Sequence, residues 1–302
     1  MQTGCLRYVV LLGWICLLSG CAAVPHSTLS VNGQEIADSL NARYVNRASD
    51  CAGRPAHECS GVMVRVFGLD SDPPISPTPD QIARNAVSFS FIRDDIPTTL
   101  LFQTGWAGMV VNTGDNAGFV RLTVRCAWPY DAYTNFRPDG CGRATGDMTP
   151  TIKSRPCAQQ GIDTPEKWAA HFASLGDNKP YKYFSCGFAP TVEGFNLSIA
   201  SHALIPNPED RRRWNEILIA AWREEDVPAL PIEALFFTPD TGISIGLVHV
   251  KQCAIFFATS RRIPLLRLDL EKADKKIFSF DPADQIDFDA ALPTCLYRAE
   301  NR

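Results

Sequence analysis

The sequence predicts an α+β fold in which a disulfide-stapled, antiparallel β-rich N-terminal half packs with a helical C-terminal half. Short β-type runs separated by turn residues between 61 and 128 indicate the sheet. Capped helical segments after residue 162 and an even set of cysteines indicate the rest. The 302-residue chain is long enough to bury a full core.

The N-terminus has the pattern of a bacterial lipoprotein signal. Arg7 precedes an apolar run over residues 8–18, and residues 18–21 (LSGC) form a lipobox. The run is shorter than the roughly 20 residues that cross a bilayer core. We therefore expect a signal peptide over 1–20, a lipid on Cys21 as the membrane anchor, and outer-membrane sorting within the cell envelope.

The remaining chain divides into a tether over 21–33 and a single elaborated α+β domain over 34–302. Sub-lobes of this domain can be drawn at 34–161 and 162–302. The formal net charge of −4 argues against a nucleic-acid partner. The sequence does not indicate an oligomeric state.

Export changes how the eleven cysteines are interpreted. Two leave with the signal and one carries lipid, so the other eight are expected to form four disulfides in an oxidising compartment. Chain order suggests Cys51 with Cys59, Cys126 with Cys141, Cys157 with Cys186, and Cys253 with Cys295, although eight cysteines allow roughly a hundred pairings. The chain has no CxxC motif and its histidines are scattered, so we expect no metal site and no cysteine nucleophile.

The N-terminal half begins with an amphipathic helix over 33–47, where Ile36, Leu40 and Tyr44 recur at helical spacing. A proline-rich loop is expected over 70–79. Alternating or apolar runs predict strands over 62–66, 87–92, 100–103, 109–111 and 119–128.

The C-terminal half begins with a helix that Thr164 caps and Pro165 starts. Further helices are expected over 193–204, from 207 onward, and over 247–259. The one from 207 carries an apolar stripe at helical spacing. Its members are Trp214, Ile217, Leu218, Ala221 and Trp222. Buried strands are predicted over 231–237 and 263–270.

Residues 87–95 contain the first candidate ligand-binding pattern. Alternation places Val87 and Phe89 on one face and Ser88 and Ser90 on the other, ahead of Arg93. Paired hydroxyls beside an arginine can bind ribose or phosphate. An amphipathic edge strand with its serines in solvent explains the same pattern. Arg121 and Arg125 similarly share a face suited to a diphosphate, or to pairing with acids.

The segment 126–142 concentrates aromatic, acidic and basic side chains between two cysteines. A disulfide would make it a rigid display for a charged aromatic ligand, or only a pinned surface loop. Separately, residues 242–246 (GISIG) match the GxSxG nucleophile elbow, which would make Ser244 the nucleophile of a serine hydrolase. His249 is too close in sequence to turn back onto Ser244, so a helix entry with two glycines is the plainer interpretation.

Several segments together resemble the halovibrin-like secreted proteins of Gram-negative bacteria. The matching pieces are residues 59–62 (CSGV), 88–93 (SFSFIR) with Asp95, 126–142, 154–157 (SRPC), 215–216 (NE) and 231–237 (PIEALFF). The resemblance covers most of residues 34–272. It implies cleavage of NAD at the nicotinamide–ribose bond, by hydrolysis or by ADP-ribosyl transfer, with NAD as substrate and no further cofactor.

That reaction passes through an oxocarbenium-like sugar, and its chemistry suggests a role for each candidate. We expect Asp131 to stabilise the cation and Arg93 and Arg137 to hold phosphate. Ser88 and Ser90 would bind ribose. Trp128 would stack on a ring, with Thr134 and Asp95 as further substrate-binding candidates.

Two further carboxylates complete the list of candidates. Glu216 lies opposite the apolar stripe of its predicted helix and is expected to be a solvated surface group. Glu233 is a reserve candidate for the acid, because burying it unpaired in an apolar strand would be costly. The alternatives to an NAD-cleaving enzyme are a non-catalytic envelope lipoprotein that binds a ligand or partner, and a serine hydrolase at Ser244. Convergence of Asp131, Arg137, Arg93 and the face of Ser88 and Ser90 on one pocket would favour the enzyme, whereas their scattering over open surface would favour the non-catalytic lipoprotein.

Overall fold

One eight-stranded sheet organises the fold, with strand order β4-β5-β2-β1-β3-β6-β7-β8. Neighbouring strands are antiparallel except for β6 and β7, which run parallel. The strands are β1 (Val62–Val66), β2 (Val87–Ile92), β3 (Ala107–Val111), β4 (Val124–Trp128), β5 (Glu216–Ile219), β6 (Ile232–Phe237), β7 (Leu265–Leu268) and β8 (Phe278–Ser279). This confirms the α+β class, although strands from both halves of the chain build the sheet.

Helices surround the sheet in this computed structural model, which describes residues 32–67, 75–101, 107–131, 156–176, 185–239, 244–288 and 290. All of these belong to one compact unit, Val31–Arg302. The α-helices are α1 (Gly33–Val45), α2 (Pro79–Arg84), α3 (Pro165–Ser174), α5 (Val192–Ala203), α6 (Pro208–Arg211) and α7 (Ile245–Thr259). Short 3-10 turns are η1 (Ala56–Glu58), η3 (Cys157–Gln160), η4 (Glu224–Ala229) and η6 (Pro282–Asp284).

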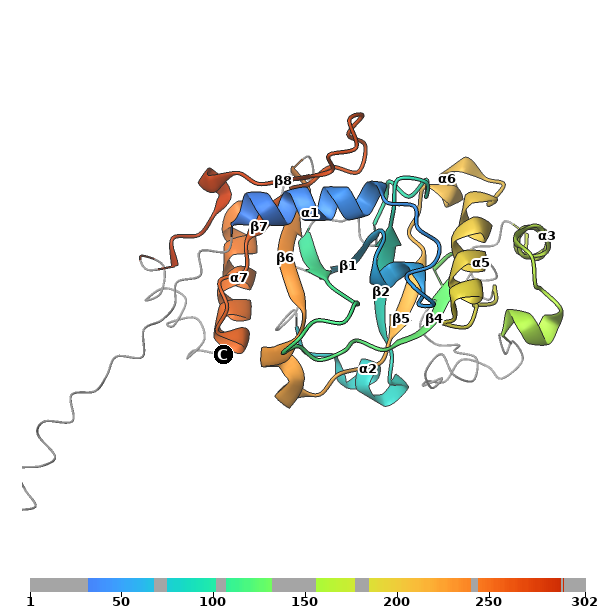
Figure 1. The fold of residues 1–302 in the computed structure, drawn as a ribbon, viewed down its shortest axis with the longest axis horizontal. Helices are drawn as coiled ribbons and strands as arrows, with labels where there is room; N and C mark the ends of the chain where they lie inside the picture. The colour runs from blue at the N-terminus through green and yellow to red at the C-terminus, as the bar shows by residue number, and fades with distance from the viewer. Residues whose placement is uncertain are drawn as a thin grey trace, which may run out of the picture. The chain divides into compact units, whose positions relative to one another are not determined.

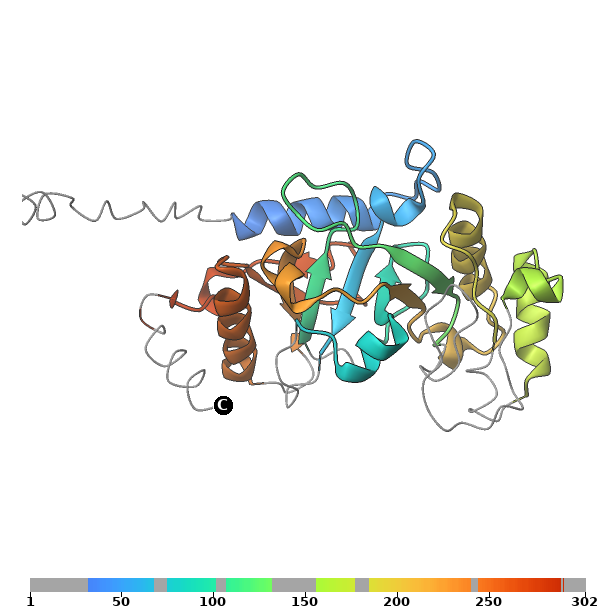
Figure 2. The same ribbon diagram turned by 90° about the horizontal axis from the view of Figure 1, so that it is seen from below.

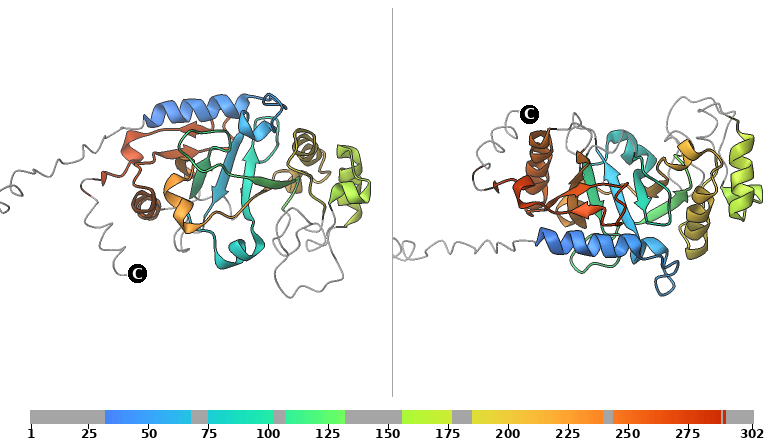
Figure 3. Two further views of the ribbon diagram at one scale, coloured as in Figure 1. Left: turned by 60° about the horizontal axis from the view of Figure 1, so that its bottom comes forward. Right: turned by 90° about the horizontal axis from the view of Figure 1, so that it is seen from above.

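Figure 1 shows α7 near the β6–β8 end of the sheet and α3 and α5 near its β4 end. In Figures 2 and 3 the strands lie between α1 on one side and α7 on the other. Helix α1 buries Leu40 and Tyr44 in a cluster with Val62 and Val64 of β1. Helix α7 contributes Val248 to the cluster on the opposite face.

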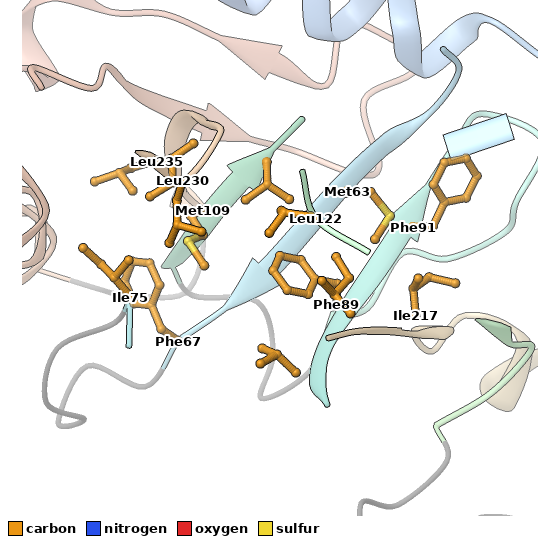
Figure 4. Packing of buried hydrophobic residues seen from close by; sticks show 14 of the residues in the cluster. Met63, Phe67, Ile75, Phe89, Phe91, Met109, Leu122, Ile217, Leu230 and Leu235 are labelled. Atoms are coloured by element: carbon orange, nitrogen blue, oxygen red, sulfur yellow. The ribbon is translucent and has the colours of Figure 1, made fainter. Parts of the chain in front are cut away.

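The larger core cluster fills the face opposite α1, as Figure 4 shows. Phe89 and Phe91 of β2 pack there with Met63, Met109 and Ile217, all at most 2% exposed. Because successive strand residues point to opposite faces, burial of Phe89 and Phe91 in this core directs Ser88 and Ser90 to the other face of the sheet.

Caps explain where several helices begin. Thr164 accepts a hydrogen bond from the Lys167 N–H and α3 starts at Pro165, as predicted. Helix α2 was not predicted, but its first turn has a capping box in which Thr78 and Gln81 each bind the other's backbone N–H. A threonine followed by a proline and, three residues on, by a glutamine was the available signal.

One predicted helix is wrong in a way that matters for the site. The segment from 207 forms only the short α6 and then the strand β5, which pairs with both β2 and β4. The run Glu216–Ile219 is buried on both faces, so the β-branched Ile217 and Ile219 pack as strand residues.

Two further predicted strands differ from the elements that the structure forms. Residues 119–123 precede the strand, and only Val124–Trp128 pairs as β4. Leu100 and Leu101 are not in a strand, and 102–103 lie outside the described residues.

Two disulfides among the described residues staple the domain. Cys51 is bonded to Cys59 and Cys157 to Cys186, confirming two predicted pairs. Cys126 and Cys253 are also disulfide-bonded, and their partners lie outside the described residues, as do Cys21, Cys141 and Cys295.

Candidate functional site

The candidate site lies where β1 and β2 separate. Their pairing runs from Val62↔Ile92 to Val64↔Ser90 and then stops, although β1 continues to Val66 and β2 starts at Val87. A cavity of about 240 Å³ opens at this divergence. Its polar lining comes from Arg65, Gln81, Ser88, Ser90, Asp131 and Glu216.

The two predicted serines share this cavity. Ser88 and Ser90 both line it, and Ser90 is buried with 7% of its surface exposed. Their position follows from the alternation of β2, whose phenylalanines occupy the opposite core. Both hydroxyls are therefore held on rigid backbone, because β2 pairs with β1 on one side and β5 on the other.

Glu216 is the carboxylate that the sequence interpretation missed. It is 3% exposed, and the Ser88 hydroxyl donates a hydrogen bond to its Oε1. The prediction of a solvated surface group is wrong, because Glu216 is on β5 and paired in register with Trp128 of β4. A buried carboxylate is costly unless it accepts hydrogen bonds, and a hydroxyl donor to an ionised oxygen is among the stronger ones.

Arg65 of β1 also lines the cavity, but its side chain lies on the sheet face of Met63 and Met109, opposite the face of the two serines. Its Nη2 donates to Gln81 Oε1 at 3.3 Å, and its guanidinium lies 5.6 Å from the Trp222 ring centroid. Within the described residues Arg65 forms no salt bridge, and its buried Nη1 has no hydrogen-bond partner. Burial lowers the pKa of Arg65 to about 10, so the group stays charged at neutral pH.

Asp131 lines the same cavity, so it joins the two predicted serines there. Asp131 is the last described residue before the gap that begins at 132, and Thr134 and Arg137 lie outside the described residues. Trp128 is fully buried, its Nε1 donates to Cys126 Sγ at 3.0 Å, and it does not line the cavity. Its predicted stacking role therefore has no support from its position.

Arg93 and Asp95 are not brought to the cavity. The Arg93 guanidinium binds Asp95 through two hydrogen bonds of 2.6 and 2.9 Å. It also donates to the Ala48 carbonyl and to the Ser60 hydroxyl, and Arg93 is only 5% exposed. These contacts tie the end of β2 to the loop after α1. They give Arg93 a structural role that requires no bound phosphate.

Two other candidates, Arg121 and Glu233, have local partners. Arg121 is exposed and forms salt bridges with the buried side chain of Glu58 and the exposed one of Asp115. Glu233, the reserve acid, pairs with Arg43 at 2.6 Å and accepts a hydrogen bond from Asn112.

Arg125 lies elsewhere, at a second cavity. That cavity, of about 390 Å³, is lined in part by Phe188 and by Gly194 and Leu197 of α5. Neither of the predicted serines lines it.

Ser244 is the N-cap residue of α7, between β6 and the helix, but its side chain makes no capping bond. The imidazole of His249 forms a hydrogen bond of 2.7 Å with the Asp284 carbonyl. The described hydrogen bond of this histidine is therefore to the backbone of another segment and not to Ser244. Gly242 and Ile243 lie outside the described residues. Nothing described around Ser244 assembles a serine–histidine pair.

Comparison with models of known protein families finds no match, and comparison with curated proteins finds no relative. Within the described ranges, no helix is both long and apolar enough to cross a bilayer. In the same ranges, no group of three or more His, Cys, Asp and Glu side chains is arranged to hold a metal ion. The site must therefore be interpreted from its own geometry.

Proposed function

We propose that this protein cleaves the nicotinamide–ribose bond of NAD, either as a glycohydrolase or by transferring ADP-ribose to an acceptor. The observation that carries the proposal is that two carboxylates, two hydroxyls and an arginine line one cavity between diverging strands. These are the groups that the reaction requires, and the resemblance to halovibrin-like proteins independently implies the same chemistry.

Glu216 is the residue that we assign to the sugar cation. When the C1′–N bond breaks, nicotinamide leaves with the bonding electron pair and positive charge develops on the ribose. A buried carboxylate stabilises that charge more strongly than water does, because the surrounding dielectric is low. The Ser88 hydroxyl, which donates to Glu216 Oε1, keeps the carboxylate oriented toward the cavity.

Ser90 and Arg65 account for binding. Ser90 presents a hydroxyl that can exchange hydrogen bonds with a ribose hydroxyl. Arg65 carries the guanidinium that we assign to a phosphate. Its Nη1 has no hydrogen-bond partner and is shielded from solvent, so binding requires the neighbouring side chains to move. The apolar walls supplied by Val64 and Phe89, together with Trp214, suit a planar ring.

The size of the cavity fits part of a dinucleotide rather than a whole one. Its 240 Å³ is below the roughly 300–1,000 Å³ of sites that enclose a complete drug-sized ligand. We therefore assign it to the nicotinamide–ribose end. Water completes the reaction in the hydrolase: its oxygen bonds to C1′, and its proton is released. In the transferase an acceptor nucleophile takes the place of water.

The lipobox supports a location for this proposed enzyme in the cell envelope, as an outer-membrane lipoprotein anchored through Cys21. An exported enzyme meets NAD only where it is released, imported or presented by another cell. A non-catalytic ligand-binding lipoprotein remains the alternative outcome of the test below.

The test compares three forms of the full chain with etheno-NAD, whose fluorescence rises when nicotinamide is released. Wild type is expected to turn it over, and Glu216→Gln to lose at least about a hundredfold in kcat, the range typical for removal of an electrostatic stabiliser. Glu233→Gln is the matched control, because Glu233 is also a strand carboxylate but does not line the cavity. Wild-type turnover that persists in Glu216→Gln contradicts the assignment of Glu216, whereas NAD binding without turnover in wild type favours the ligand-binding alternative.

A further inference from the structure

Asn215 occupies the point where the backbone pairing between β2 and β5 ends. The ladder runs through Val87↔Ile219, Ser88↔Leu218 and Phe89↔Ile217, and β5 begins one residue earlier at Glu216. Continued pairing would place Asn215 opposite Phe91. There the backbone contact is replaced by the side chain of Asn215.

The Asn215 amide bonds both backbone groups of Phe91. The Phe91 N–H donates to Asn215 Oδ1 at 2.8 Å, and Asn215 Nδ2 donates to the Phe91 carbonyl at 2.7 Å. The asparagine is 3% exposed, so these bonds are shielded from water. A side-chain amide has the same donor and acceptor as a peptide unit, and it therefore extends the ladder by one step while holding the two backbones further apart.

Hydrogen bonds from two residues of β2 consequently hold residues 215–216 at the start of β5. Phe91 is bound by Asn215, and Ser88 is bound by the carboxylate of the next residue, Glu216. The first link fixes the backbone just before Glu216, and the second fixes its side chain. Together they set where the carboxylate lies relative to the hydroxyls of Ser88 and Ser90.

We propose that Asn215 is a positioning residue that holds Glu216 in register with the paired serines of β2. This inference rests on the proposed NAD-cleaving function. Asn215 does not line the cavity, so it acts through Glu216 and not on the substrate. Its loss would leave two buried backbone groups of Phe91 without partners, and the start of β5 would move to satisfy them.

The structure offers a matched control for the test. Asn41 of α1 makes the same pair of bonds to a single residue, accepting from the Phe278 N–H at 2.9 Å and donating to the Phe278 carbonyl at 2.8 Å. Asn41 does not line the cavity either. Asn41→Ala thus removes the same number and kind of hydrogen bonds at a place unconnected with Glu216.

The experiment measures kcat, KM and thermal midpoint for the full chain and both variants with etheno-NAD. Misplacement of a reacting group by about 1 Å costs on the order of a hundredfold in rate. We expect Asn215→Ala to lower kcat by about 10- to 100-fold with KM within about twofold of wild type, and Asn41→Ala to keep wild-type kcat. Wild-type kcat in Asn215→Ala, or an equal loss in both variants, overturns the inference. An inactive wild type overturns the proposed function itself.

A second variant keeps the inference testable if Asn215→Ala does not fold. In Asn215→Asp the ionised side chain cannot donate to the Phe91 carbonyl, but the protonated acid can both donate and accept. Its kcat relative to wild type should therefore rise as pH falls from about 8 to 5, since burial raises the pKa of a carboxyl above its usual value of about 4. A ratio that does not change with pH contradicts the positioning role.

Discussion

Two buried histidines should make this domain sensitive to mild acid. His202 of α5 is fully buried, with its Nδ1 against the Pro129 carbonyl and its Nε2 3.1 Å from the Thr98 hydroxyl. His57 is 4% exposed, with Nδ1 2.9 Å from the Thr113 hydroxyl. Burial lowers the pKa of each histidine to about 4.

The sign and size of the effect follow from these values. An unfolded histidine has a pKa of about 6.5, so between pH 6.5 and 4 the unfolded chain binds protons that the folded chain does not. Stability is therefore present above pH 6.5 and is lost as pH falls toward 4. Each histidine should remove roughly 2 kcal/mol of unfolding free energy between pH 7 and pH 5, about 4 kcal/mol together.

Urea unfolding at pH 7 and pH 5, with disulfides intact, measures this difference. His202→Gln should lower stability at pH 7 yet reduce the difference between the two pH values by about half, because one titrating group is gone. Carboxylates with lowered pKa values, such as Asp94 beside Arg47, act at more acidic pH and do not confuse the comparison. Equal unfolding free energies at the two pH values would refute the reasoning.

Three further changes have defined expected outcomes. Arg65→Gln should raise KM for NAD about tenfold and leave kcat nearly unchanged in steady-state kinetics, because Arg65 is assigned to phosphate binding; a fall confined to kcat would contradict that role. Ser88→Ala should lower kcat about tenfold through loss of the hydrogen bond to the buried carboxylate, and unchanged turnover would show that this bond is dispensable. In denaturant unfolding, the double change Cys157→Ala/Cys186→Ala should cost roughly 3–4 kcal/mol because that disulfide closes a separation of 29 residues, and a loss below about 1 kcal/mol would contradict the loop-closure estimate.

The position of the paired serines was predictable because β2 follows a simple rule. One face of the strand is apolar, with Phe89 and Phe91 in the core, so strict alternation identifies Ser88 and Ser90 as neighbours on the other face. Local sequence contained everything needed for that step. Which other groups meet the serines depends on strand order, and alternation within one strand cannot reveal it.

The carboxylate was missed because the sequence around it fits two periodicities. Trp214, Ile217 and Leu218 fall at helical spacing, and on a helix Glu216 points away from that stripe. On β5, residues two apart share a face, so Glu216 points with Leu218 and into the structure. The β-branched pair Ile217 and Ile219 was the signal for a strand, and it was outweighed by the apparent stripe.

The arginines show the limit of reasoning from residue type alone. Arg93 is satisfied by Asp95, two residues away, and by a hydroxyl and a carbonyl distant in sequence. Arg65 interrupts the apolar run Val62–Val66. A charged residue in an otherwise apolar central strand is rare and indicates a functional role, so the sequence did contain a signal for Arg65. Only the three-dimensional partners distinguish a structural arginine from one with capacity to bind.

The central claim is that the cavity between β1 and β2 binds the nicotinamide–ribose end of NAD against Glu216. A crystal structure of the Glu216→Gln variant soaked with NAD tests it most directly, since that variant should bind without turnover. The account predicts a ribose within hydrogen-bond distance of the Ser88 or Ser90 hydroxyl and a phosphate at Arg65. Dinucleotide bound at another surface, or an empty cavity at millimolar NAD, would contradict it.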